Sequence, residues 1–350
     1  MYSVTQRIRR IQQPYGGYLP IRSFHATTLD DGNYLIPDEN IHGSLVGLCV
    51  DYMTRFLNGT PAKEAFFISL AGAYELDLSS KKPNQENPKT EFNRARELLS
   101  KITGLNEDSV IHACKLVGYD VCFRAGTTYY QPVDAIEPNW ATIHNITVMI
   151  QRSLSFLQQY GPIVKDGFTF EGGYTRIVSS GDGDFITKDT LWDFKVLKTK
   201  PSSRDTLQLL MYYLMGRRSI HPELHQIQNI GFFNPRSNTI YRMDVSDIPE
   251  DVISTVESEV IGYESPRKEN VPVASFTKPG KTKKRPQKID FANPQKIYPL
   301  GSEINHPAFG KGVVVEIRPT GALHLTKVRF GDGYRLLCTS KLNQILQDEK

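Results

Sequence analysis

Residues 180–196 read SGDGDFITKDTLWDFKV, and this stretch decides which fold the chain is expected to have. Two runs rich in β-branched and aromatic residues flank residues 187–190, which predicts two strands joined by a short turn. Side chains alternate along a strand, so Asp193 and Lys195 share one face and the apolar residues around them point to the other. Asp184, at the end of the first strand, is expected to meet them across the pair.

Two interpretations fit these charged residues. Two carboxylates and a backbone carbonyl are oxygen ligands suited to magnesium or manganese, and a lysine two residues after the second acid can stabilise negative charge or orient an attacking water. In the alternative, Asp182, Asp184 and Asp189 only form turns. Asp193 and Lys195 would then make a surface ion pair. A D-x-K motif by itself favours this alternative, because so short a motif often arises by chance.

The residues that follow favour the metal site. Gln208 and Tyr212 are four positions apart in DTLQLLMYYLMGRR, residues 205–218, for which we predict a helix with Asp205 as its cap. The two side chains therefore lie on one face of that helix. An acid that ends one strand, D-x-K on the next and Q-x-x-x-Y on the following helix form a far more specific combination than D-x-K alone.

This combination resembles the RecB-like branch of the PD-(D/E)XK nuclease superfamily, which includes CRISPR-associated exonucleases, over residues 168–216. The resemblance implies Mg²⁺ or Mn²⁺ held by two aspartates, a catalytic lysine, and a glutamine and a tyrosine that line the site and help to place the DNA. In this chain they are, in the same order, Asp184, Asp193, Lys195, Gln208 and Tyr212.

The resemblance also implies two further acids as metal ligands. Glu171 is expected on the strand that leads into the site, where family members often carry an acid. Family members usually have an upstream helix of the pattern G-x-x-x-H-x-x-x-E, and its counterpart here begins at Gly43. Gly47 stands where the histidine is expected. Asp51 occupies the acidic position, where it either supplies a carboxylate or is a solvated helix residue.

The order of predicted elements favours an α/β fold. The resemblance implies that it is a PD-(D/E)XK core with a helical N-terminal part. Apolar residues at helical spacing mark residues 40–160, and strands with one helix follow in a catalytic core at 163–250. This nuclease domain, residues 1–263, precedes a basic, proline-rich linker at 264–298. Residues 299–346 alternate like short strands punctuated by glycines and form a separate all-β module.

The C-terminal module, residues 299–346, is similar to the small SH3-like or Tudor-like barrel at the C-terminus of UvrD-type helicases. His306, Phe309, Gly310 and Gly312 carry the match. Most of them are also the residues that a tight turn and a small barrel core require. The resemblance implies binding of a protein, such as a helicase, a polymerase or a subunit of a defence complex, or of nucleic acid.

The composition is that of an ordinary globular protein, with 39% hydrophobic and 23% charged residues among 350. A net charge of +4 permits a polyanionic partner. No apolar run is long enough to cross a bilayer and no secretory signal is evident, so we expect a cytoplasmic protein. The four cysteines lack the spacing of the family's iron–sulfur subset, and no cluster is expected. The linker residues expected to contact phosphates are Lys281, Lys283, Lys284 and Arg285.

Together these features predict a divalent-metal-dependent DNA nuclease that acts in phage or mobile-element defence or in DNA repair. The alternative is a weakly active or inactive nucleic-acid-binding adaptor that recruits a partner through the C-terminal barrel, because the helix histidine is missing. The sequence leaves open whether the enzyme is an exonuclease or an endonuclease, and whether it cuts single-stranded DNA, double-stranded DNA or RNA. Its polarity, its sequence specificity and the number of bound metal ions, one or two, are open as well. The oligomeric state is also open.

Overall fold

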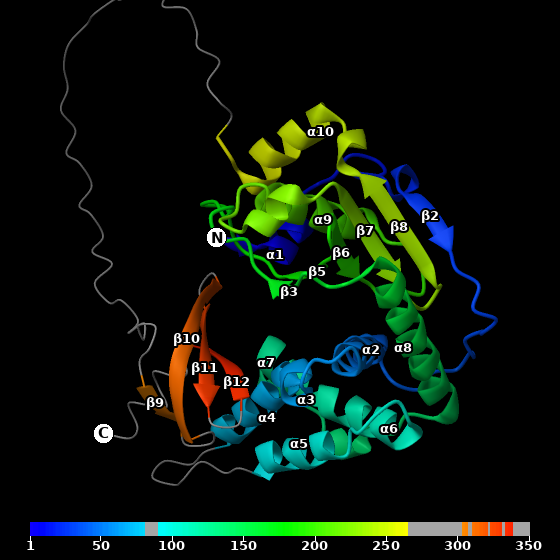
Figure 1. Cartoon of the computed structure of the whole chain (residues 1–350), viewed down its shortest axis with the longest axis vertical. Coiled ribbons are helices and arrows are strands. Elements are labelled where there is room, and N and C mark those ends of the chain that lie inside the picture. The colour runs from blue at the N-terminus through cyan, green and yellow to red at the C-terminus, as the bar shows by residue number, and fades with distance from the viewer. Residues whose placement is uncertain (81–89, 265–302, 307–309, 321–322, 331–332, 339–350) are drawn as a thin grey trace, which may run out of the picture. The chain divides into compact units, whose positions relative to one another are not determined.

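The computed structural model describes residues 1–80, 90–264, 303–306, 310–320, 323–330 and 333–338. The chain divides into two compact units, Met1–Ile253 and Ser254–Lys350. The first unit is a mixed α/β structure built on a six-stranded sheet (Figure 1). The predicted α/β class is therefore confirmed at this level. Among the described residues, no helix combines the length and the apolar character needed to cross a membrane.

Helices occupy much of residues 40–160, as predicted, and α9 matches the helix predicted at residues 205–218. A further helix forms near the N-terminus, where a capping box at Ser3 starts α1. Between residues 62 and 79 the chain forms two helices, α3 and α4, with Phe66 between them. The α-helices are α1 (Val4–Arg10), α2 (Gly43–Leu57), α3 (Ala62–Ala65), α4 (Phe67–Ser79), α5 (Thr90–Ser100), α6 (Glu107–Leu116), α7 (Asp120–Arg124), α8 (Trp140–Tyr160), α9 (Ser203–Gly216) and α10 (Glu250–Thr255).

The central sheet has the strand order β2-β8-β7-β6-β5-β3. All neighbours are antiparallel except β6 and β7, which are parallel and are connected through α9. A separate two-stranded sheet pairs the N-terminus with a segment just before β5. The strands of the first unit are β1 (Tyr2–Ser3), β2 (His25–Thr28), β3 (Lys165–Phe168), β4 (Val178–Ser180), β5 (Gly183–Ile186), β6 (Thr190–Phe194), β7 (Asn229–Asn234) and β8 (Thr239–Asp244).

One face of the sheet is covered by α8, whose C-terminal half carries aromatic side chains. Phe156 stacks on Phe233 with ring centroids 4.3 Å apart and meets Trp192 edge to face at 4.9 Å. Gly231, the register partner of Trp192 on β7, is required here, since a Cβ would come within 2.5 Å of the indole ring. The aromatic residues of β6 therefore lie on a dry face, as their alternation predicts.

The helices α2 to α7 gather beside the sheet, and α8 runs from this group to the sheet (Figure 1). Their shared core is apolar and includes Met53 of α2, Leu98 of α5 and Ile146 of α8. Phe194 and Val196, at the C-terminal end of β6, pack against the same core. The helical group is thus fixed against the end of the strand that carries Asp193.

The second unit contains a four-stranded antiparallel meander, in agreement with the predicted all-β module. Its closure into a barrel stays a prediction. Phe309 and the linker residues Lys281, Lys283, Lys284 and Arg285 lie outside the described residues. The strands are β9 (Glu303–His306), β10 (Gly310–Thr320), β11 (Leu323–Phe330) and β12 (Gly333–Cys338).

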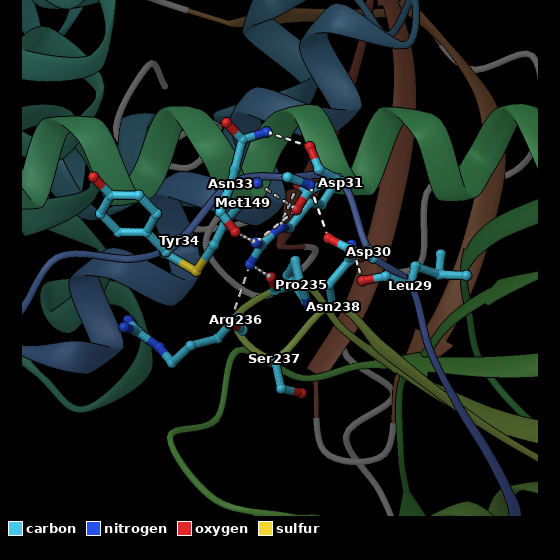
Figure 2. A network of polar contacts seen from close by, with 12 residues as sticks. Leu29, Asp30, Asp31, Asn33, Tyr34, Met149, Pro235, Arg236, Ser237 and Asn238 are labelled. Atoms are coloured by element: carbon cyan, nitrogen blue, oxygen red, sulfur yellow. Dashed lines mark hydrogen bonds and ion pairs between the residues drawn. The ribbon is translucent and has the colours of Figure 1, made fainter.

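A buried arginine on α8 ties three segments of the first unit together. Arg152 donates to both carboxylate oxygens of Asp31, at 2.8 and 3.0 Å. It also donates to the carbonyl oxygens of Asn33, Pro235 and Arg236, at 2.8, 3.1 and 3.2 Å. Figure 2 shows these partners converging from the loop after β2 and from the β7–β8 turn. The guanidinium uses its whole fork of donors, which only arginine can supply.

The ion pair between Arg152 and Asp31 is expected to make the folding stability depend on pH. Hydrogen bonds from Arg152 lower the pKa of Asp31 from 3.8 to about 2. A carboxyl group with a lowered pKa in the folded state stabilises the protein above pH 4, and that contribution is lost as the pH falls from about 4 to 2. We expect a loss of about 1–2 kcal/mol, reduced by the solvent exposure of Asp31. Urea unfolding of wild type and Asp31→Asn at several pH values in this range should converge at pH 2, and a constant difference would contradict the assignment.

Candidate active site

Asp184 and Asp193 lie on the adjacent antiparallel strands β5 and β6. The register pairs Phe185 with Trp192, and each acid is the next residue beyond that pair on its own strand. The turn between the strands is closed by a hydrogen bond from the Thr187 amide to the Thr190 carbonyl, 3.0 Å long. The two acids that the sequence singled out therefore lie on adjacent strands.

Alternation predicts that Asp193 and Lys195 share the outer or cleft-facing side of the strand. Asp193 is buried on that side, with 2% of its surface exposed, because α9 covers this face of β6. Lys195 lies just beyond the last residue of β6, and its amide donates to the Phe233 carbonyl at 3.0 Å. Its Nζ lies 2.9 Å from Asp193 Oδ2. The pair is therefore largely removed from water, which excludes the interpretation as a solvated surface pair.

Gln208 and Tyr212 extend this contact along α9. Lys195 Nζ donates to Gln208 Oε1 at 3.2 Å, and Gln208 Nε2 donates to Tyr212 Oη at 2.7 Å. The helix is capped by Ser202 rather than by Asp205, whose carboxylate instead accepts from the Ser202 amide at 2.7 Å. The capping box fixes the first turn of α9, so Gln208 faces the lysine.

Burial and mutual repulsion shift the pKa values of these groups. Desolvation and the nearby Asp184 raise the pKa of Asp193, while Lys195 opposes the shift. Desolvation and the charge of Asp51 raise the pKa of Asp184, and Lys195 opposes the rise. The Asp184 side chain is nevertheless exposed to solvent. Burial would lower the pKa of Lys195, yet the two carboxylates outweigh it and raise that pKa. Lys195 is therefore a permanent positive charge at neutral pH.

Asp184 is also fixed by the backbone of the neighbouring strand. The Phe194 amide donates to Asp184 Oδ2 at 2.7 Å, a charge-assisted hydrogen bond that opposes the rise in its pKa. The Phe194 amide makes no hydrogen bond with the other oxygen, Asp184 Oδ1. The carboxylate thus has a defined orientation next to Asp193.

Asp51, on α2, is a further carboxylate near the sheet. Besides desolvation, the charge of Asp51 raises the pKa of Asp184. Desolvation in turn raises the pKa of Asp51, which the cations Arg55 and Arg124 oppose. One turn earlier, Gly47 faces the end of β6, since a Cβ there would contact Val196 at 3.8 Å. The face of α2 that the sequence pattern selected is therefore the one turned toward β6.

Glu171 is placed differently from the prediction. Strand β3 ends at Phe168, and Glu171 follows it in a turn instead of lying on the strand. Its Oε2 pairs with His221 Nε2 at 2.8 Å, and its Oε1 accepts from Thr169. The carboxylate is thus occupied by partners outside the Asp184–Asp193 pair. Asp182, interpreted as a turn residue, precedes β5 and feels the charges of Glu171 and Arg124, while burial raises its pKa.

The oxygen ligands that these residues offer show whether they fit a divalent cation. Among the described residues, no three histidine, cysteine, aspartate or glutamate side chains are close enough together to hold a metal ion. Magnesium is commonly held by one or two carboxylates, with water and substrate phosphates completing the octahedron. Asp193 Oδ2 is buried and has Lys195 Nζ as its partner at 2.9 Å. Two carboxylates on adjacent strands are the donor set that such a cation takes.

Comparison with known proteins adds no relative: we found no family model, no curated protein and no solved structure that matches the chain. The function of the site must therefore be inferred from the geometry of its own residues.

Two other groups named by the sequence lie elsewhere. His306, on β9, belongs to the second unit. Cys49, Cys114 and Cys122 are buried free thiols.

Proposed function

We propose that the chain is a divalent-metal-dependent DNA nuclease with a PD-(D/E)XK core, which hydrolyses phosphodiester bonds. The observation that carries the proposal is the Asp184–Asp193–Lys195 group with Gln208 and Tyr212 behind it. These residues come from two strands and a helix. Their grouping follows the order that the sequence resemblance implies.

In this proposal, Asp184 and Asp193 hold Mg²⁺ or Mn²⁺. When bound, the ion would supply Lewis-acid stabilisation of the negative charge that grows on the phosphate oxygens. Asp184 is oriented for this by the Phe194 amide, and Asp193 by its place inside the sheet. Asp51, on α2, adds negative charge that acts on Asp184.

Lys195 then acts as a fixed cation rather than as a base, because its neighbours raise its pKa. A protonated ammonium can donate to the attacking water and stabilise the hydroxide character that it acquires as it approaches phosphorus. Gln208 accepts one of the three ammonium hydrogens and so directs the others. The chain of contacts through Tyr212 holds Gln208 in this orientation.

The C-terminal unit is proposed to be an SH3-like barrel that recruits a protein partner. The support is its all-β meander and the resemblance of His306, Gly310 and Gly312 to the helicase-associated module. The basic linker before it is proposed to contact DNA phosphates without sequence preference. Defence against phage or mobile elements and DNA repair are both settings that such an architecture serves.

The proposal is tested by a cleavage panel with the purified full chain. Linear and circular double-stranded DNA, single-stranded DNA and RNA are incubated with Mg²⁺, with Mn²⁺ or with excess chelator. We expect cleavage of at least one DNA substrate with either metal and none with chelator, because the carboxylate pair needs a cation to bind a phosphate. Activity that persists in chelator would contradict the metal site. A chain that leaves every substrate intact would contradict the proposed function.

A further inference from the structure

One face of α2 crosses the ends of three neighbouring strands. Gly47, Asp51 and Arg55 are spaced four residues apart and so lie on the same side of the helix. Gly47 faces Val196 after β6, the charge of Asp51 acts on Asp184 on β5, and Arg55 pairs with β3. These contacts follow the strand order β6-β5-β3. The helix thus carries Arg55 past the carboxylate pair to the edge of the sheet.

Arg55 is held only loosely at that edge. Its Nη2 lies 3.3 Å from Asp166 Oδ2, and both side chains are more than a third accessible to solvent, at 35% and 45%. Its Nε is buried and makes no hydrogen bond. An ion pair this exposed contributes little to stability, because water and salt screen it. Another oxyanion could therefore replace Asp166 as the partner of the guanidinium.

A second arginine, Arg124 of α7, lies beside α2. Arg124 Nη2 donates to Tyr52 Oη at 3.0 Å, and Tyr52 donates to the buried Asp120 at 2.6 Å. Ser69 Oγ donates to the other oxygen of Asp120 at 2.5 Å. This buried network anchors one side of the guanidinium, while 53% of the side chain stays accessible. Arg124 is thus a positioned cation and not a mobile surface residue.

The two arginines balance a concentration of negative charge. Asp166 pairs with Arg55 and is the register partner of Phe185, the residue after Asp184. Arg124 opposes the burial that raises the pKa values of Asp51 and Asp182. DNA carries a negative charge at every phosphate, so such a group of carboxylates repels it unless cations intervene. Arginine presents a planar fork that matches two oxygens of one phosphate. The sequence interpretation assigned no phosphate contact in this part of the chain.

We propose that Arg55 and Arg124 bind the DNA backbone on the helical side of the Asp184–Asp193 pair and hold the strand for cleavage. Phosphate oxygens replace Asp166 at Arg55 and occupy the accessible edge of Arg124. Both residues bind substrate without taking part in bond breakage. The inference depends on the proposed nuclease function and adds to it the surface that receives the DNA.

The test measures DNA affinity as a function of salt in the full chain. Fluorescence anisotropy with a labelled duplex and a labelled single strand gives Kd at several NaCl concentrations. In a background of Asp193→Asn, which prevents cutting, we compare Arg55→Ala, Arg55→Lys, Arg124→Ala, Arg124→Lys and Asp166→Asn. Each alanine variant is expected to weaken binding about tenfold. Each should also lower the slope of log Kd against log salt by about 0.9 on duplex or 0.7 on a single strand.

The remaining variants separate phosphate contact from folding. Lysine variants should keep the salt slope, since the charge is retained, and Asp166→Asn should tighten binding because Arg55 loses its competing partner. Loss of folding cannot produce tighter binding. Arg96→Ala, an exposed arginine on α5, serves as the control and should bind as the parent does.

The outcomes distinguish this inference from the proposed function. If the wild type cleaves DNA but both alanine variants keep the parent Kd and salt slope, the arginine surface is wrong and the nuclease proposal stands. Weaker binding in Asp166→Asn would likewise contradict the exchange of Asp166 for phosphate. If the wild type cleaves no nucleic acid in any metal, the proposed function fails first and this inference fails with it.

Discussion

Replacing Lys195 with methionine is expected to lower the rate of DNA cleavage about 100- to 1,000-fold, with little change in DNA affinity. The physical reason is the position of the ammonium, 2.9 Å from Asp193 and 3.2 Å from Gln208, in a largely buried site. Methionine preserves most of the side-chain volume but carries no charge, so it cannot stabilise negative charge in the transition state. Single-turnover kinetics with saturating enzyme and Mg²⁺ measure this rate apart from binding.

Lys188→Met is the matched control for this variant. Lys188 is an exposed residue of the turn between β5 and β6, only seven positions earlier in the chain. It should cleave DNA at the wild-type rate, because a lysine in open solvent does not act on a buried site. Circular dichroism establishes that both variants fold. Equal cleavage rates for Lys195→Met and Lys188→Met would show that Lys195 does not contribute to the cleavage step.

The second large effect is expected on stability, from Arg152→Met. The substitution leaves Asp31 without its cation and the carbonyl oxygens of Asn33, Pro235 and Arg236 without their donor. Asp31 is partly exposed and loses its charged partner, and the three carbonyl oxygens lose their buried donor, so we expect a loss of about 3 kcal/mol. Methionine fills much of the same space, so the loss reports on hydrogen bonds and charge rather than on a cavity. Urea denaturation at pH 7 measures the free energy of unfolding.

An exposed arginine on a helix provides the comparison. Arg96→Met on α5 should change the free energy of unfolding by less than about 0.5 kcal/mol, as surface substitutions usually do. Arg152→Lys should recover only part of the loss, because an ammonium cannot match the fork of donors. A wild-type unfolding midpoint for Arg152→Met would show that the five hydrogen bonds do not stabilise the fold.

Local patterns predicted much of the site. The alternation around Asp193 and the i, i+4 spacing of Gln208 and Tyr212 identified side chains that the structure brings together. These predictions succeed because the period of a strand or a helix fixes which residues share a face. The burial of Asp193 was missed, since a pattern within one strand does not reveal that α9 covers it.

Long-range features were harder to predict. Glu171 was expected to point into the site, but β3 ends three residues before it, and its partner His221 is 50 residues away in the sequence. Arg55 could have been found, since it continues the spacing of Gly47 and Asp51 by one more step. Arg124 could not, because its place depends on the packing of α7, which carries Asp120, against Tyr52 of α2.

The central claim is that Asp193 supports metal-dependent cleavage, and one comparison tests it most directly. Asp189 lies four residues earlier, in the turn, where its carboxylate accepts from Thr190 and lies 3.7 Å from Arg242. The measurement is the initial rate of DNA cleavage in Mg²⁺ by the wild type, Asp193→Asn and Asp189→Asn, each confirmed to be folded. We expect Asp189→Asn to cleave at the wild-type rate and Asp193→Asn to be at least about 100-fold slower. Cleavage by Asp193→Asn at the wild-type rate would contradict the account.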